Sequence, residues 1–99
     1  MGLVAKKIKH PYITQVEGIC NGEPIIIGTR TPVRSIVGYY FNLKYSVDEI
    51  VNQLPYLTPA QVFDALSYYH DHKEEIDQLI YENSEEYLME KYPPGKYEL

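Results

Sequence analysis

The fold is decided by residues 46–69, which read SVDEIVNQLPYLTPAQVFDALSYY. Two capping boxes divide this stretch, because Ser46 is followed three residues later by Glu49, and Thr58 in the same way by Gln61. In a capping box each side chain accepts a hydrogen bond from the backbone N–H of the other residue, which fixes where a helix begins. The spacing predicts a helix of about two turns, a short connection that contains proline, and a longer second helix.

This order of elements is the layout of a helix-turn-helix, in which the second helix enters the major groove of DNA. The second predicted helix carries no Lys or Arg, and its expected outward residues are Gln61, Asp64 and Ser67. Gln61 can pair with adenine and Ser67 can contact a phosphate, whereas the carboxylate of Asp64 is repelled by the DNA backbone. The cations that DNA requires would come from the preceding residues. The candidate DNA-binding residues are Thr29, Arg30, Arg34, Lys44, Thr58, Gln61 and Ser67.

Residues 13–27 have the composition of β-strands, and the Asn21-Gly22 pair predicts a tight hairpin turn between two of them. Three consecutive isoleucines follow Pro24, so this strand is apolar on both faces. One face therefore needs cover from helices or from a second subunit.

A helix is expected from Pro32 to Leu43, with Thr31 as its N-cap. Arg34 lies in the first turn, where a cation opposes the helix dipole, so a phosphate or carboxylate partner is expected for it. Arg30 either meets such a ligand too or pairs with an acidic residue at the start of the next helix. The apolar side of the helix is formed by Val33, Ile36, Val37, Tyr40 and Phe41.

A further helix is predicted from about Asp71 to Tyr92, where Pro93 ends it. This part of the chain is acidic, since residues 51–99 hold three Lys against ten Asp and Glu. Acidic segments often fold on a partner protein, and a plain dimerisation helix explains the pattern equally well. The candidate partner-binding residues are Tyr81, Glu85, Tyr87, Tyr92 and Tyr97.

The whole chain has 99 residues and a formal net charge of −5, although residues 1–50 hold six Lys and Arg against four acids. One cysteine, Cys20, excludes an internal disulfide. We find neither a membrane-spanning run nor a signal peptide, so a cytoplasmic location is expected. Eleven tyrosines without a tryptophan are typical of surfaces that become interfaces, and a homodimer is expected.

Catalytic and metal-binding patterns are not evident in the sequence. His70, Asp71 and His72 are adjacent, but residues two apart on a helix do not share a face, so a surface run is expected rather than a metal site. His10 is isolated in the sequence, and no serine, histidine and carboxylate order points to a nucleophile. We therefore expect no enzyme activity, no cofactor and no metal.

The expected fold is mostly α, with a short N-terminal β-hairpin, a helix-turn-helix-like tri-helical core and a longer C-terminal helix. All 99 residues form a single domain in this interpretation. Residues 1–12 are a loose basic arm, residues 13–70 are the core, and residues 71–99 are an acidic helix and tail.

Residues 19–33, ICNGEPIIIGTRTPV, resemble the signature segment of domain-of-unknown-function family 433, whose general form ends in Gly-Thr-Arg-Ile-Pro-Val. The continuation is similar, with Ser-x-x-Glu-Ile at residues 46–50 and Leu-Pro-x-Leu-Thr at residues 54–58. The resemblance extends from about Tyr12 to His70. The departures from the family pattern are Asn21, Glu23 in place of a lysine, Ile27 where a basic residue is frequent, and Thr31.

The resemblance implies an antitoxin-like, helix-turn-helix-like protein, since members are commonly found beside a ribonuclease-type toxin of the PIN class. It implies neutralisation of that toxin and binding of the protein's own promoter DNA. The alternative is a homodimeric protein-interaction module that does not bind DNA.

Overall fold

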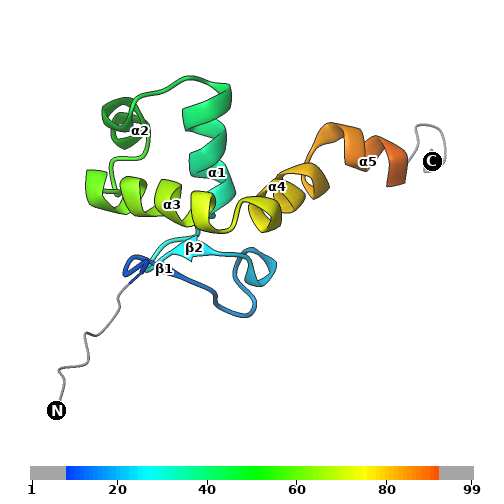
Figure 1. Cartoon of the computed structure of the whole chain (residues 1–99), viewed down its shortest axis with the longest axis horizontal. Coiled ribbons are helices and arrows are strands. Elements are labelled where there is room, and N and C mark those ends of the chain that lie inside the picture. The colour runs from blue at the N-terminus through cyan, green and yellow to red at the C-terminus, as the bar shows by residue number, and fades with distance from the viewer. Residues whose placement is uncertain (1–8, 92–99) are drawn as a thin grey trace, which may run out of the picture.

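The computed structural model describes residues 9–91. In chain order the elements are β1 (Ile13–Thr14), η1 (Cys20–Gly22), β2 (Ile25–Ile26), α1 (Val33–Val37), η2 (Gly38–Asn42), α2 (Val47–Gln53), α3 (Pro59–Asp71), α4 (Lys73–Glu82) and α5 (Glu85–Lys91). Helices α1, α2 and α3 form a body, the two strands lie on one side of it, and α4 and α5 extend away from it (Figure 1). The expected mostly helical fold with a short antiparallel pair of strands is confirmed.

The core lies between the three helices of the body, the strand β2 and the first half of α4. Apolar side chains from all of these elements are buried together, because each helix presents one apolar face to the others. The buried core residues are Ile26, Val33, Ile36, Val37, Ile50, Leu57, Val62, Ala65, Leu66, Tyr69 and Ile76. Two of the isoleucines after Pro24 are thus covered by helices of the same chain, while Ile27 is exposed.

Both predicted capping boxes are present. Ser46 Oγ accepts from the backbone N–H of Glu49 at 3.1 Å, and the Glu49 carboxylate accepts from the N–H of Ser46 at 2.9 Å. Thr58 and Gln61 exchange the same two bonds at the start of α3. Each cap contributes about 1 kcal/mol, so these local bonds determine where α2 and α3 begin.

The predicted hairpin exists, but the prediction of a tight turn was wrong. The strands pair in antiparallel register with Ile13 opposite Ile26, and a longer connection that includes η1 joins them. Asn21 and Gly22 have the expected positive φ of 56° and 77°, and Cys20 joins them at 50°. Three successive residues in the left-handed region curl the connection into a helical turn instead of reversing the chain in two residues.

The helix expected from Pro32 to Leu43 is a short α-helix, α1, followed by a π-helical turn, η2. The Leu43 N–H donates to the carbonyl of Gly38 at 3.1 Å, which is the five-residue spacing of a π-helix. Pro32 is the N-cap rather than the first helical residue, and the Thr31 hydroxyl is bonded to Tyr56 instead of capping the helix. The wider turn rotates the side chains that follow, so Tyr40 and Phe41 are exposed and not in the core as predicted.

The long final helix is divided in two at Asn83 and Ser84. The side chain of Asn83 donates to the carbonyl of Leu79, and Ser84 Oγ accepts from the N–H of Tyr87 at 3.1 Å. These local bonds compete with the helical ones, so α4 ends and α5 begins at this point. Between residues 9 and 91, no helix is both long and apolar enough to cross a membrane.

Residues 9–12 belong to the segment that was expected to be a loose arm, and their interactions differ from that prediction. The side chain of His10 is 9% exposed and bonded to two residues of α3, and the backbone N–H of Tyr12 donates to Asp64. The rest of the predicted arm, residues 1–8, lies outside the described residues.

Candidate functional site

Two of the predicted DNA-binding residues, Thr58 and Gln61, are the capping box of α3. Gln61 Oε1 accepts from the Thr58 N–H at 2.8 Å, and Thr58 Oγ1 accepts from the Gln61 N–H at 3.3 Å. Both side chains are therefore bound to the backbone at the position where a base or phosphate contact was expected.

Thr29 and Arg34, also predicted to bind DNA, have partners within the chain. Thr29 Oγ1 donates to the carbonyl of Ile26 at 2.8 Å and accepts from the N–H of Thr31 at 3.0 Å. Arg34 Nε donates to the carboxylate of Glu23 at 2.9 Å, and the Glu23 side chain is only 6% exposed. The carboxylate partner expected for Arg34 is thus Glu23, the residue that replaces the lysine of the family pattern.

The other three predicted DNA-binding residues, Arg30, Lys44 and Ser67, are exposed. Neither Arg30 nor Lys44 has an ion pair with another described residue, so the predicted pairing of Arg30 with Asp48 or Glu49 is absent within residues 9–91. Arg30 lines a shallow hollow of about 170 Å³ with Tyr56, which lies in the connection between α2 and α3. The structure therefore brings Arg30 beside the helix-turn-helix connection.

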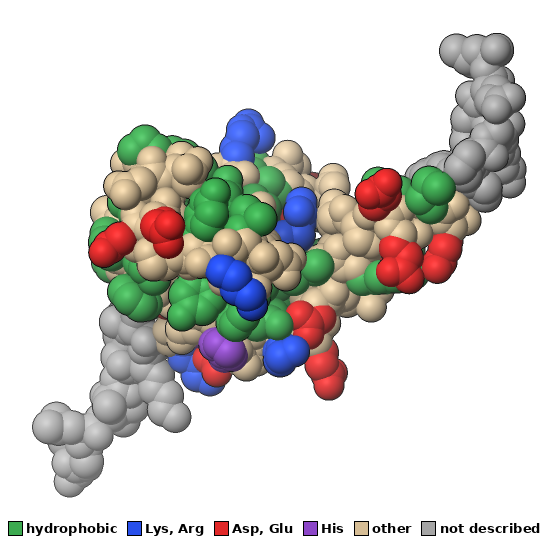
Figure 2. Space-filling view, turned by 90° about the horizontal axis from the view of Figure 1, so that it is seen from above, with side chains coloured by type: hydrophobic (Ala, Val, Ile, Leu, Met, Phe, Trp, Pro, Cys, Tyr) green, Lys and Arg blue, Asp and Glu red, His purple; other side chains and the backbone are tan. Residues whose placement is uncertain are grey.

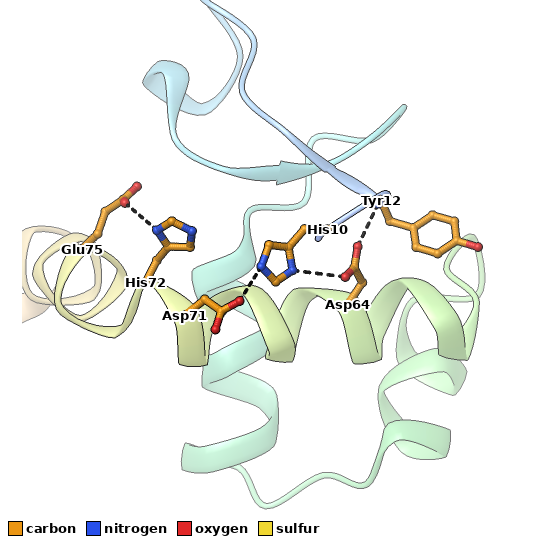
Figure 3. A network of polar contacts seen from close by, with 6 residues as sticks. All are labelled: His10, Tyr12, Asp64, Asp71, His72 and Glu75. Atoms are coloured by element: carbon orange, nitrogen blue, oxygen red, sulfur yellow. Dashed lines mark hydrogen bonds and ion pairs between the residues drawn. The ribbon is translucent and has the colours of Figure 1, made fainter. Parts of the chain in front are cut away.

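The outward face of α3 is partly covered by residues 10–12 (Figure 3). His10 lies between two carboxylates of α3, at 3.3 Å from Asp64 and 2.9 Å from Asp71. Asp64 also accepts from the N–H of Tyr12 at 2.8 Å. Asp64, whose carboxylate was expected to be repelled by DNA, thus binds the N-terminal segment. This part of α3 is covered by that segment and is not accessible to a DNA groove.

The ring of Tyr68 completes the same cluster. It makes an edge contact with His10 at 5.0 Å between ring centroids and stacks on His72 at 4.2 Å. His72 in turn lies 3.5 Å from the carboxylate of Glu75. Burial and the negative charge of Glu75 both raise the pKa of the Tyr68 hydroxyl above its ordinary value. The sequence shows no sign of this cluster, because His10 is 54 residues from Asp64.

The acidic C-terminal residues form a surface that we call the arm, residues 73–91, which comprises α4 and α5. Two predicted partner-binding residues, Tyr81 and Tyr87, instead hold α5 on α4. Their rings meet edge to face at 5.4 Å, and the Tyr81 hydroxyl donates to the carboxylate of Glu90 at 3.0 Å, which raises the pKa of Tyr81. Glu85 is exposed, and the other two predicted residues, Tyr92 and Tyr97, lie outside the described residues.

The outer face of α5 carries two apolar side chains that the sequence analysis missed. Leu88 is 46% exposed and Met89 is 49% exposed, beside the exposed carboxylates of Glu85 and Glu86. A spacing test for a helix that begins at Glu85 would have placed both of them outside the face of Tyr87 and Glu90. Figure 2 shows Lys and Arg side chains among hydrophobic ones over the body, with Asp and Glu side chains at its left end and along the arm.

A cleft of about 520 Å³ lies between η1 and α4. The carboxylates that line it have partners within the chain: Glu23 is paired with Arg34, Glu75 with His72, and Glu82 accepts from Gln78. Among residues 9–91, no three His, Cys, Asp or Glu side chains are grouped so that they could hold a metal ion.

The comparisons with other proteins concern mainly the body. The family described as "Protein of unknown function (DUF433)" matches residues 13–69. The chain is similar to a solved structure of a DUF433 member protein from Anabaena variabilis ATCC 29413, with 32% sequence identity and a TM-score of 0.65. That similarity covers 70% of this chain and 67% of the other. No curated protein matches the chain. The family match over more than half of the residues, together with this structural similarity, shows that the chain belongs to the DUF433 family.

Proposed function

We propose that the protein is the antitoxin of a toxin–antitoxin pair and that its arm binds a PIN-type ribonuclease toxin. The observation that carries this proposal is the composition and position of the arm. It contains two lysines against seven carboxylates, and Ile76 is its one buried residue. A helical segment with so little of its surface in the core is available to a partner protein.

The charge of the arm fits this class of partner. A ribonuclease must attract the phosphates of RNA, so its substrate-binding surface carries positive charge. The arm presents Glu85 and Glu86 next to Leu88 and Met89, which combines negative charge with apolar contact area. Binding there would place carboxylates where RNA phosphates enter, and the toxin would be inhibited by competition.

The test is co-expression with the neighbouring reading frame, followed by co-purification and a ribonuclease assay of the complex. The variant replaces Glu82, Glu85, Glu86 and Glu90 by Gln. The control replaces three exposed carboxylates of the body, Glu17, Asp48 and Glu49, by their amides, so that the total charge changes by a similar amount.

We expect the arm variant to lose the complex or to bind the toxin at least about tenfold more weakly, and the control variant to bind it normally. Binding by the parent is expected to weaken steeply as the salt concentration rises. Equal loss in both variants would show a non-specific charge effect and would contradict the role of the arm. Failure of the parent to bind the neighbouring protein would contradict the antitoxin proposal itself.

A second proposed role, binding of promoter DNA, rests on Arg30. This cation is exposed, has no ion pair with another described residue, and lies beside the connection between α2 and α3. The test is salt-dependent binding to the DNA upstream of the gene. We expect Arg30→Ala to weaken this binding, and normal binding by the variant would contradict the role of Arg30. Absence of DNA binding by the parent would favour the alternative of an interaction module that does not bind DNA.

A further inference from the structure

The turn that follows α1 exposes a run of large apolar side chains. We call this surface the η2 patch and define it as Tyr40, Phe41, Leu43 and Lys44. Leu43 is 57% exposed, and the two aromatic side chains are each more than a third exposed. A shallow hollow of about 390 Å³ adjoins them and is lined by Leu43 and Tyr39 among others. Adjacent large apolar side chains on the surface are characteristic of an interface.

The backbone of the η2 patch is unusual in two respects. Residues 38–42 form a π-helical turn, a rare form found mainly at functional positions. Lys44 has a φ of 61°, which is the left-handed region that a lysine seldom adopts. Tyr39 and Tyr45 stack at 5.6 Å across the base of the turn, and Phe41 packs on Tyr69 at 5.7 Å. These contacts hold the patch in one shape, which lowers the entropy cost of binding.

The η2 patch carries one charge, the cation of Lys44, and the exposed carboxylates of Asp48 and Glu49 follow it at the start of α2. From Pro24 to Val47 the sequence contains no Asp or Glu and three cations. Arg34 is neutralised by Glu23, whereas Lys44 has no ion pair with another described residue. A complementary surface must therefore combine apolar side chains with carboxylates.

The chain itself presents such a surface on α5. The inner face of this helix, with Tyr87 and Glu90, contacts Tyr81 of α4. At 100° per residue, Glu85, Leu88 and Met89 lie on the opposite face, whereas Glu86 lies at the side of the helix; all four are exposed. The two surfaces are complementary in charge, and each has apolar side chains without cover.

We propose that the outer face of α5 in one copy of the chain docks on the η2 patch of a second copy. A two-fold axis makes the contact reciprocal, so that each copy gives one α5 and receives one. Leu88 and Met89 meet Tyr40, Phe41 and Leu43, and Glu85 or Glu86 pairs with Lys44. In this dimer the η2 patch and the outer face of α5 are covered in both copies. No such surface is then left to bind a third copy.

The first test is the oligomeric state of the purified full-length chain, by sedimentation velocity over a range of concentrations. The parent is expected to dimerise. Phe41→Ser and the double variant Leu88→Ser/Met89→Ser are each expected to weaken the dimer about 100-fold, because every substitution acts in both symmetric contacts. Phe63→Ser is the control, since Phe63 is also an exposed phenylalanine, at 60% against 37% for Phe41, but lies on α3. Circular dichroism confirms that each variant is folded.

The second test mixes the two defective variants. The Phe41→Ser chain keeps a normal α5, and the Leu88→Ser/Met89→Ser chain keeps a normal η2 patch, so a mixture has one complete contact. Only an α5-to-η2 dimer forms a heterodimer in this mixture. A dimer made of two η2 patches would leave the Leu88→Ser/Met89→Ser chain able to dimerise by itself, and a dimer made of two α5 helices would leave the Phe41→Ser chain able to do so. Either result would overturn the proposal, as would a monomeric parent or a mixture that forms no heterodimer.

The ion pair is tested by exchanging charges. Lys44→Glu and Glu85→Lys/Glu86→Lys are each expected to weaken the dimer, and their combination in one chain is expected to restore it. Absence of restoration would contradict this pairing of surfaces. The dimer uses the same outer face of α5 that we propose for the toxin, so the two contacts exclude each other. All of these measurements use the chain alone, so their outcome is independent of whether the arm binds a toxin.

Discussion

Helices α3 and α5 are both amphipathic, but they bury their apolar side chains to very different extents. In α3 the apolar face is inside the protein, with Val62, Ala65, Leu66 and Tyr69 buried. In α5 no residue is buried, and Leu88 and Met89 are about half exposed. A helix gains most of its stability from the burial of its apolar face. The comparison shows that the body is stabilised by its own buried core, whereas the arm has an exposed apolar face that a partner can cover.

The polar side chains of the two helices differ in the same way. Those of α3 are largely engaged within the chain, in the capping box and in the bonds from Asp64 and Asp71 to His10. On α5, the carboxylates of Glu85 and Glu86 are exposed, and Glu85 lies on the same side as the apolar residues. Helix α3, whose sequence suggested DNA recognition, thus has more of its polar side chains bonded within the chain than α5 has.

The largest expected effect is the difference in stability cost between a substitution in the core of the body and one on α5. Ile36→Ala leaves a cavity at a fully buried position, so we expect a loss of about 3–4 kcal/mol in the free energy of unfolding. Leu88→Ala on α5 should cost less than about 0.5 kcal/mol. Urea denaturation at concentrations where the chain is monomeric measures both. A similar cost for the two substitutions would show that α5 is packed as tightly as the body.

The next effect concerns the two arginines near the start of α1. Arg34→Ala leaves the buried Glu23 carboxylate without its cation, and we expect a loss of about 3 kcal/mol. Arg30→Ala, at an exposed position without an ion pair among residues 9–91, should change stability by less than about 0.5 kcal/mol. Adding Glu23→Gln to Arg34→Ala should recover part of the loss. No recovery would mean that the cost does not come from an unpaired carboxylate.

A smaller effect is expected where residues 10–12 dock on α3. His10→Ala removes two bonds to Asp64 and Asp71, and we expect a loss of about 1–2 kcal/mol together with faster amide exchange at Tyr12. His70→Ala is the matched control, because His70 is exposed on the same helix. Equal thermal stability of the two variants would contradict the anchoring role of His10.

The smallest effect is a pH dependence at the start of the arm. Lys73 Nζ donates to Asp77 at 2.8 Å, and this bond, followed by one from the Tyr69 hydroxyl, lowers the pKa of Asp77 below its ordinary value of 3.8. A lowered pKa in the folded state stabilises the fold above that ordinary value and is lost as the pH falls through the folded pKa. The Asp77 side chain is largely exposed, so the contribution is small. We expect Asp77→Asn to flatten the acid limb of the stability curve slightly, and an unchanged limb would contradict this.

The sequence analysis was most successful where short-range patterns act. The capping boxes at Ser46 and Thr58 were predicted correctly, because each depends on two residues that are three apart. It failed at η2, where the single Gly38 did not indicate a wider turn, and at Ser84, where the helix ends without proline or glycine to mark the change. Of the candidate site residues, Arg30 and Glu85 are exposed as expected, while Arg34 and Tyr81 have intramolecular partners.

By itself the sequence determined where α2 and α3 begin and the division into a positive first half and an acidic second half. These properties follow from neighbouring residues and from composition. Only the tertiary structure decided that Glu23 neutralises Arg34, that His10 covers part of α3, and that Phe41 is exposed. Each of these outcomes depends on which groups, distant from one another in the sequence, are brought together away from water by the fold. That information lies in the packing of the whole chain rather than in any one segment.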